Sequence, residues 1–102
     1  MLFRSQVAID KDGEVVAPED IVGQAEFVYQ ALEKILNEAG ASLDDVVKTT
    51  VYLTSMNEFQ QFSEVRNKYF KNAEPVSTLV EVSKLVKPGC VVEIEVVAVK
   101  QK

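Results

Sequence analysis

Hydrophobic positions along the chain follow two spacings, one typical of strands and one typical of helices. Apolar and polar residues alternate over 46–53, and alternating or paired apolar residues return over 76–82 and 91–99. Residues 2–9 form a further strand-like stretch, and Asp12-Gly13 predicts a turn into a short strand at 14–16. The pattern therefore predicts five strands, the first two of them joined as a hairpin.

Two segments carry apolar residues at helical spacing. In the first, an apolar stripe runs from Ile21 to Ala39, with Asp20 placed to cap it and Gly40 to end it. The second follows a capping-box sequence at 55–58 and runs to about Phe70. Three phenylalanines of this second segment are spaced for packing in the core: Phe59, Phe62 and Phe70.

The predicted order of elements is ββαβαββ, which indicates an α+β fold in which two helices pack against a mixed sheet. The strand–helix–strand unit over 46–82 is expected to form a parallel pair, and the hairpins add antiparallel strands. With 102 residues, 47% of them hydrophobic and 26% charged, the chain is expected to form a single globular domain, 1–102.

Charge and composition exclude several classes of function. A net charge of −5 would repel a phosphate backbone, so no nucleic-acid partner is expected. No apolar run approaches the ~20 residues of a membrane span, and the start lacks the pattern of a secretory leader, so we expect a cytoplasmic protein without membrane contact.

The chain has no histidine and one cysteine, Cys90. Histidine-based triads and cysteine or histidine metal sites are therefore excluded, and no metal site is expected. We interpret Cys90 as a small buried hydrophobe, because no residue near it in sequence would lower its pKa. Asp44-Asp45 is interpreted as a cap within the turn 42–45 and not as a metal pair.

The last predicted strand has two different faces. One is wholly apolar, whereas the other places Glu93 and Glu95 among Val91, Val97 and Val99. Carboxylates on a strand face are costly to bury dry, so this face must meet water, a partner or a ligand cleft. Two close carboxylates would also raise the pKa of one of them.

The stretch from Glu38 to Thr54, followed by Met56-Asn57-Glu58-Phe59, resembles the Rid family, also called the YjgF family, and 92–99 resembles its closing strand. The resemblance covers nearly the whole chain. It implies a chorismate-mutase-like fold and a homotrimer packed through sheet faces, with a small-molecule cleft at each subunit boundary. It also implies cofactor-free hydrolysis of reactive imines and enamines, such as 2-aminoacrylate, to 2-oxo acids and ammonia.

The resemblance also implies roles for individual residues. Glu93 matches the family glutamate that positions the attacking water. The alternative is that Glu93 pairs with a lysine or is solvated at a subunit boundary. Ser77 stands where the family has the arginine that grips the substrate carboxylate. Two further expected ligand contacts stand where the family has other residues: Ser63 replaces an asparagine and Ser5 replaces a glycine. Gln6, next to Ser5, and Leu79, two residues after Ser77, are also expected to contact the ligand. A first strand and a Gly-Pro-Tyr-Ser stretch of the family have no counterpart here, so an exposed sheet edge is expected beside 2–9.

Three hypotheses follow. The first is a homotrimer that binds a small carboxylate or imine and whose deaminase activity is weak or lost because Ser77 replaces the arginine. The second is an active imine deaminase that combines Glu93 with a substitute cation, either Arg4 or a lysine. The third is a non-catalytic interaction or chaperone-like protein. We interpret Arg4 as an exposed residue of the terminal strand and Arg66 as part of a solvated helix face.

Overall fold

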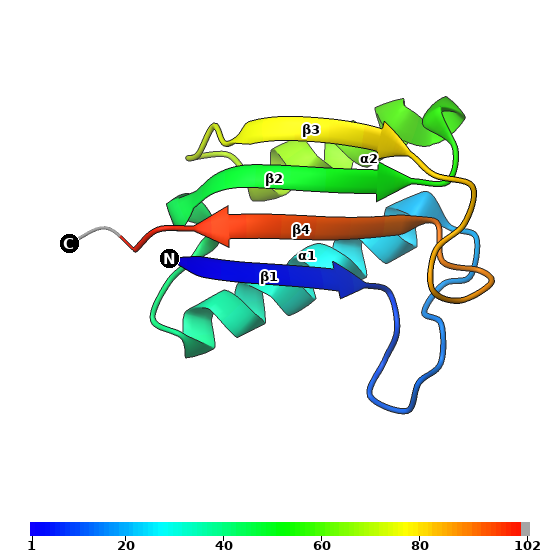
Figure 1. Ribbon diagram of the computed structural model, residues 1–102, viewed down its shortest axis with the longest axis horizontal. Coiled ribbons are helices and arrows are strands. Elements are labelled where there is room, and N and C mark those ends of the chain that lie inside the picture. Colours follow the sequence, from blue (N-terminus) through cyan, green and yellow to red (C-terminus); the bar gives the residue numbers. More distant parts are fainter. Residues whose placement is uncertain (101–102) are drawn as a thin grey trace.

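The computed structural model describes residues 1–100, which form one sheet and two helices packed on it (Figure 1). The elements are β1 (Leu2–Val7), α1 (Ile21–Glu38), β2 (Val46–Leu53), α2 (Phe59–Tyr69), β3 (Val76–Glu81) and β4 (Val92–Ala98). Short 3-10 turns, Leu43–Asp45 and Met56–Glu58, precede β2 and α2. The predicted α+β class, with a mixed sheet packed by two helices, is confirmed.

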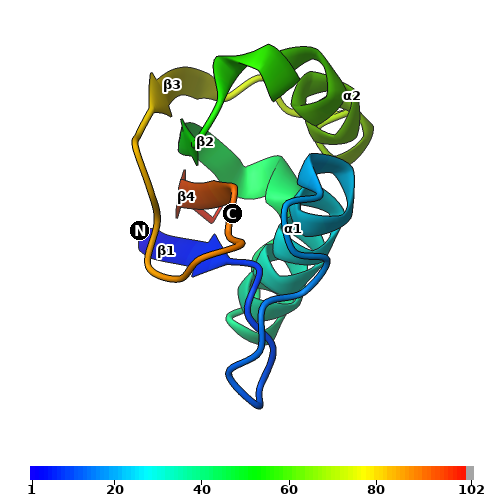
Figure 2. The same cartoon turned by 90° about the vertical axis from the view of Figure 1, so that its right-hand side faces the viewer.

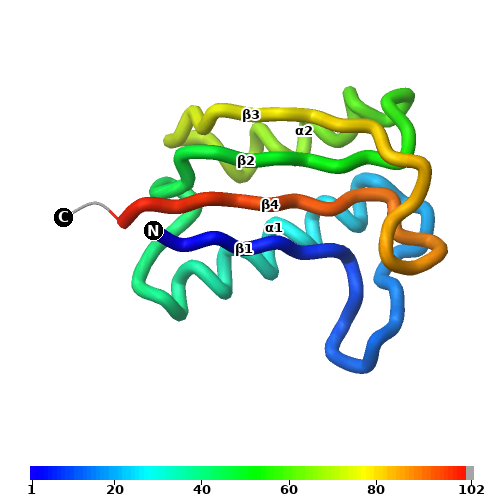
Figure 3. Tube along the Cα trace, in the orientation of Figure 1, coloured from blue at the N-terminus to red at the C-terminus, as the bar shows by residue number. Residues whose placement is uncertain are grey.

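The strands lie in the order β1-β4-β2-β3. β4 is antiparallel to both of its neighbours, and β2 and β3 are parallel, as the strand–helix–strand pattern predicts. β1 pairs with β4, and Leu2 lies opposite Ala98. The chain therefore enters the sheet at the same end at which β4 leaves it (Figure 3). Among the described residues β1 is an edge strand, as expected for the stretch beside 2–9.

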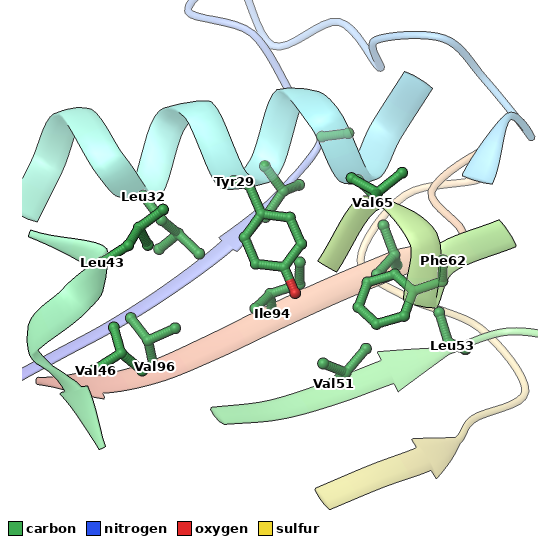
Figure 4. Close-up of a cluster of buried hydrophobic side chains, with 14 of the residues drawn as sticks. Tyr29, Leu32, Leu43, Val46, Val51, Leu53, Phe62, Val65, Ile94 and Val96 are labelled. Carbon is green, nitrogen blue, oxygen red and sulfur yellow. The ribbon is translucent and has the colours of Figure 1, made fainter. Parts of the chain in front are cut away.

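Both helices cover the same face of the sheet, and the opposite face carries no helix within residues 1–100 (Figure 2). The core fills the space between the two layers. Tyr29 and Leu32 of α1, Phe62 and Val65 of α2, and inward-facing residues of β2 and β4 are buried there (Figure 4). No helix of the described part is long and apolar enough to cross a membrane.

Local hydrogen bonds begin and end the elements near the predicted positions. The Asp20 carboxylate accepts from the Gly23 amide at 3.2 Å and caps α1. Ser42 and Asp45 form a reciprocal capping box before β2, which supports the interpretation of Asp44-Asp45 as a cap. Gly40 has a φ of +81°, a conformation that glycine adopts without strain, and it follows the end of α1.

Two predictions about local structure are wrong. The predicted strand at 14–16 does not form: β1 ends at Val7, and only an isolated bridge between Ile9 and Val15 remains of the hairpin. Two backbone hydrogen bonds, from the Asp10 amide to the Glu14 carbonyl and from the Val16 amide to the Ala8 carbonyl, flank that bridge. The pairing cannot extend beyond Val16, because Ala17 has a φ of +46° and Pro18 lacks an amide hydrogen. The element order is therefore βαβαββ. Phe59 is 39% exposed and is not a core residue, unlike Phe62.

Candidate functional site

The two carboxylates of β4 lie on the sheet face that carries no helix. Residues opposite each other in neighbouring strands share a face, and Glu93 lies opposite Val7 of β1 and Tyr52 of β2. The residues on either side of Glu93, Val92 and Ile94, are buried beneath the helices. The alternation of β4 therefore directs Glu93 and Glu95 away from the core, as the sequence predicts.

Each of these carboxylates is engaged by a neighbouring hydroxyl. The Ser5 hydroxyl donates to Glu93 Oε2 at 2.7 Å, so the structure brings together two of the expected site residues that are 88 positions apart. The pKa of Tyr52 is raised, chiefly because its hydroxyl is hydrogen-bonded to Glu95 and also because of the charges of Glu95 and Glu93. The centre of the open face is thus acidic and is organised by side-chain hydrogen bonds.

Apolar side chains surround this acidic centre. Phe3 of β1 is 57% exposed and lies opposite Val97, while Val76 and Val80 of β3 are 68% and 36% exposed. By register, Val76 and Val80 share the face of Tyr52 and Glu93. The open face therefore combines exposed hydrophobic surface with a hydrogen-bonded glutamate.

The second group of expected site residues lies on the other side of the sheet. Ser77 pairs in register with Thr49, which is only 1% exposed and points into the helix-side core. Leu79 pairs with Val51 and packs against that core. Ser77 also lines a hollow of about 520 Å³ between α2 and β3, whose walls are Arg66, Asn67, Phe70, Lys71, Ala73, Glu74, Pro75 and Ser77.

The remaining expected contacts also lie on the helix side. Ser63 lies on α2, one turn before Arg66, and its hydroxyl donates to the Gln60 carbonyl at 3.0 Å. Gln6 pairs with Ile94, a buried residue, so the backbone of β1 separates its side chain from Glu93. Within one chain the candidate residues therefore fall into two sets, Ser5 with Glu93 on the open face, and Ser63, Ser77, Leu79 and Gln6 behind it.

The structure keeps Arg4 on the edge strand, away from the Ser5–Glu93 pair, and places Arg66 in the hollow beside Ser77. Arg4 pairs with Val96 and so lies on the helix side of β1, where its Nη1 donates to the Phe3 carbonyl at 2.7 Å. It cannot reach the Ser5–Glu93 pair on the opposite face. Arg66, interpreted from sequence as part of a solvated helix face, lines the same hollow as Ser77. The helical period places Arg66 on the face of Ser63, but only tertiary packing sets that face beside β3.

The chemistry open to this arrangement is that of carboxylates, hydroxyls and a few cations. No group of three or more potential metal ligands occurs among residues 1–100. Cys90 is buried and free, as predicted. A glutamate fixed by a hydroxyl can orient a water molecule and accept its proton. The hollow beside Ser77 offers cationic and neutral donors to a small anion.

Known proteins share the sequence pattern and the fold of this chain. The family model described as "Endoribonuclease L-PSP" matches residues 1–100. A RutC family protein of Pyrococcus abyssi is 42% identical over 96 residues, which cover 94% of this chain and 75% of that relative. The 2-iminobutanoate/2-iminopropanoate deaminase of Mus musculus is 36% identical over 95 residues, which cover 93% of this chain and 70% of the mouse protein.

A solved structure of the conserved Rid protein family, from Yersinia pestis, superposes with a TM-score of 0.86 at 38% identity. The match covers 93% of this chain and 75% of that structure. Sequence identity and backbone geometry therefore agree over nearly the whole described chain. The chain belongs to the Rid (YjgF) family.

Proposed function

We propose that this protein assembles as a homotrimer in which the open sheet face of each copy packs against the β3 edge of the next, with a small-molecule cleft at each subunit boundary. In that cleft it binds small 2-imino and enamine carboxylic acids and hydrolyses them slowly to 2-oxo acids and ammonia. The observation that carries the proposal is the division of the candidate residues: Glu93 with Ser5 faces one way, and the hollow beside Ser77 faces the other. Two copies are needed to place them around one ligand.

The exposed hydrophobic residues of the open face support assembly. Phe3, Val76 and Val80 surround Glu93 and Glu95, and a monomer would leave these apolar side chains in water. Contact of the open face with the β3 edge of a neighbouring copy would bury part of this apolar surface and place Glu93 beside the hollow of that neighbour. Light scattering at micromolar concentration is expected to give three times the chain mass, and a monomer would contradict the proposal.

The chemistry is hydrolysis of a carbon–nitrogen double bond by water. Glu93, held by the Ser5 hydroxyl, orients a water molecule and accepts its proton as the water oxygen bonds to the imine carbon. The proton passes to the imine nitrogen and gives a carbinolamine. Glu93 then removes the proton of the new hydroxyl group and delivers it to the same nitrogen as the carbon–nitrogen bond breaks, so that the carbon becomes the carbonyl of a 2-oxo acid and ammonia leaves. An enamine such as 2-aminoacrylate enters this path after it tautomerises to the imine. The mouse relative, whose name describes deamination of 2-imino acids, supports this reaction class.

The rate is expected to be low because position 77 itself offers only a neutral hydroxyl, so a cation for the substrate carboxylate must come from another wall of the hollow and holds it less directly. A guanidinium at this position would offer two parallel, charge-assisted hydrogen bonds. Hydrogen bonds to charged groups contribute about 1.5–3 kcal/mol, which is roughly 10- to 100-fold in rate when the difference is expressed in the transition state.

The experiment is ammonia release from freshly generated 2-iminopropanoate, compared with a no-protein control and with a family member that carries the arginine. The wild-type chain should exceed the no-protein rate and fall roughly 10- to 100-fold below the arginine-bearing homologue. Glu93→Gln should return the rate to the no-protein level. Glu95→Gln is the matched control, because it removes a carboxylate two residues away on the same face and should retain activity. A wild-type rate equal to the no-protein rate would refute the hydrolysis, and equal losses in both variants would refute the role of Glu93.

A further inference from the structure

We propose that Arg66 of α2 is the cation that holds the substrate carboxylate in this chain, in place of an arginine at position 77. The proposal rests on the proposed function and deepens it by naming the residue that binds the carboxylate. Arg66 and Ser77 line the same hollow between α2 and β3, so a ligand beside Ser77 lies within reach of both. The cation comes from the helix wall of the hollow instead of its strand wall.

The guanidinium of Arg66 is oriented by its surroundings. The Cζ atom of Arg66 lies 5.9 Å from the centroid of the ring of Phe59, which precedes it by seven residues on the same face of the helix. Its Nε donates to Asn67 Oδ1 at 3.4 Å. Within residues 1–100, neither terminal nitrogen donates a hydrogen bond to another residue. The two nitrogens that form a planar fork thus stay available for a carboxylate, which matches that fork in geometry.

Charge in the hollow favours a small anion, although the whole chain has a net charge of −5. The hollow contains the two cations Arg66 and Lys71 and one anion, Glu74, which leaves one net positive charge. Among the described residues Arg66 forms no salt bridge, whereas Lys68, two residues later on a different face of α2, is paired with Glu26. A monocarboxylate would therefore not need to displace an existing ionic partner from Arg66.

The hollow lies beside a packed aromatic cluster. Tyr29 is fully buried and stacks with Phe62, and Phe70, which lines the hollow, meets the Tyr29 ring edge-on at 5.6 Å. Burial raises the pKa of the Tyr29 hydroxyl, and the charge of Arg66 opposes that rise. Contact with the Phe59 ring leaves the Arg66 side chain less freedom to lose on binding than an isolated surface arginine would have.

Arg66 suits a carboxylate better than Lys71 does. The Lys71 ammonium is a point charge on a flexible stem, and its residue lies beyond the end of α2. Arg66 lies within the helix and carries a planar fork. We therefore expect planar 2-oxo and 2-imino carboxylates to bind through Arg66, with the Ser77 hydroxyl as a second donor.

The test is the affinity of the assembled protein for 2-oxobutanoate, a stable carboxylate of the product class, measured by calorimetry. Arg66→Gln is expected to weaken binding about 10- to 100-fold, and Arg66→Lys to weaken it by a smaller factor because it keeps the charge without the fork. Lys34→Gln, an exposed lysine on α1, is the matched control for net charge and should leave affinity unchanged. Ser77→Arg in the Arg66→Gln background should restore binding, because it returns a guanidinium to the same hollow.

The outcomes separate this proposal from the proposed function. If wild-type protein binds no 2-oxobutanoate, the cleft itself is refuted together with the role of Arg66. If wild-type protein binds and Arg66→Gln stays within twofold of it, Arg66 alone is refuted. Equal weakening by Arg66→Gln and Lys34→Gln would also overturn the proposal, since net charge would then explain the effect. If Arg66→Gln does not fold, Arg66→Lys decides, and an affinity equal to wild type would contradict the need for a fork.

Discussion

Replacing Gln24 with leucine tests how the start of β4, and with it Glu93, is held in place. Gln24 is fully buried in α1 and its amide group makes three hydrogen bonds. Its Nε2 donates to the Gly89 carbonyl at 2.7 Å and to the Ala17 carbonyl at 3.2 Å, and its Oε1 accepts from the Val91 amide at 2.8 Å. This one side chain therefore joins α1 to the backbone two residues before Glu93.

Losing each of these three hydrogen bonds lowers the free energy of unfolding by a different amount. The Gly89 and Ala17 carbonyls keep other donors, the amides of Glu19 and Asp20, at 2.9 and 3.0 Å. The buried Val91 amide bonds to Gln24 and would be left without a partner, at a cost of about 1–3 kcal/mol. Adding about 0.5 kcal/mol for each weakened carbonyl contact gives a loss of roughly 2–4 kcal/mol in the free energy of unfolding.

The assay is urea denaturation followed by circular dichroism at one fixed protein concentration, because assembly makes stability depend on concentration. Gln30→Leu is the matched control: Gln30 lies on the same helix, is exposed, and makes one 3.3 Å bond to Tyr69. It should change stability by less than about 0.5 kcal/mol. If Gln24→Leu unfolds within that same margin of wild type, the reasoning is refuted. In the folded Gln24→Leu protein, ammonia release should also fall, because Val91, two residues before Glu93, is no longer hydrogen-bonded to α1.

Three further predictions concern stability. Tyr29→Phe should raise the free energy of unfolding by about 1 kcal/mol in the same assay, because the buried Tyr29 hydroxyl has no hydrogen-bond partner among residues 1–100, and a decrease would contradict this. Asp20→Ala should lower it by about 1 kcal/mol through loss of the α1 cap, whereas Asp12→Ala, in an exposed loop, serves as the control. The pKa of Glu26 is lowered, first by its hydrogen bond from Lys68 and then by that from Tyr69. Glu26 therefore contributes to the free energy of unfolding above the usual carboxyl pKa of 4.5, and this contribution is lost as the pH falls through the lowered pKa. Glu26→Gln should therefore flatten the loss of stability measured below pH 4.5, and an unchanged pH profile would refute the assignment.

The sequence by itself determined most of the secondary structure. The stripe from Ile21 with Asp20 before it identified α1, and the pattern over 46–82 identified a parallel pair of strands joined by a helix. The alternation of β4 also placed Glu93 and Glu95 on one face. These predictions succeed because helical and strand periods are local properties that the order of side chains alone specifies. The pairing of 14–16 with 8–10 stays a single bridge, because the positive φ of Ala17 and the missing amide hydrogen of Pro18 stop it from extending beyond Val16.

Tertiary structure alone decided which of these faces meet. A period of two tells which residues share one face of their strand, but not which strand lies beside it or which face the helices cover. The pairing of β1 with β4 puts Ser5 against Glu93, and the packing of α2 beside β3 puts Arg66 in the hollow of Ser77. Gln24 looks like an ordinary polar helix residue until the fold buries it against Val91. These contacts join residues far apart in the chain, so no local pattern specifies them.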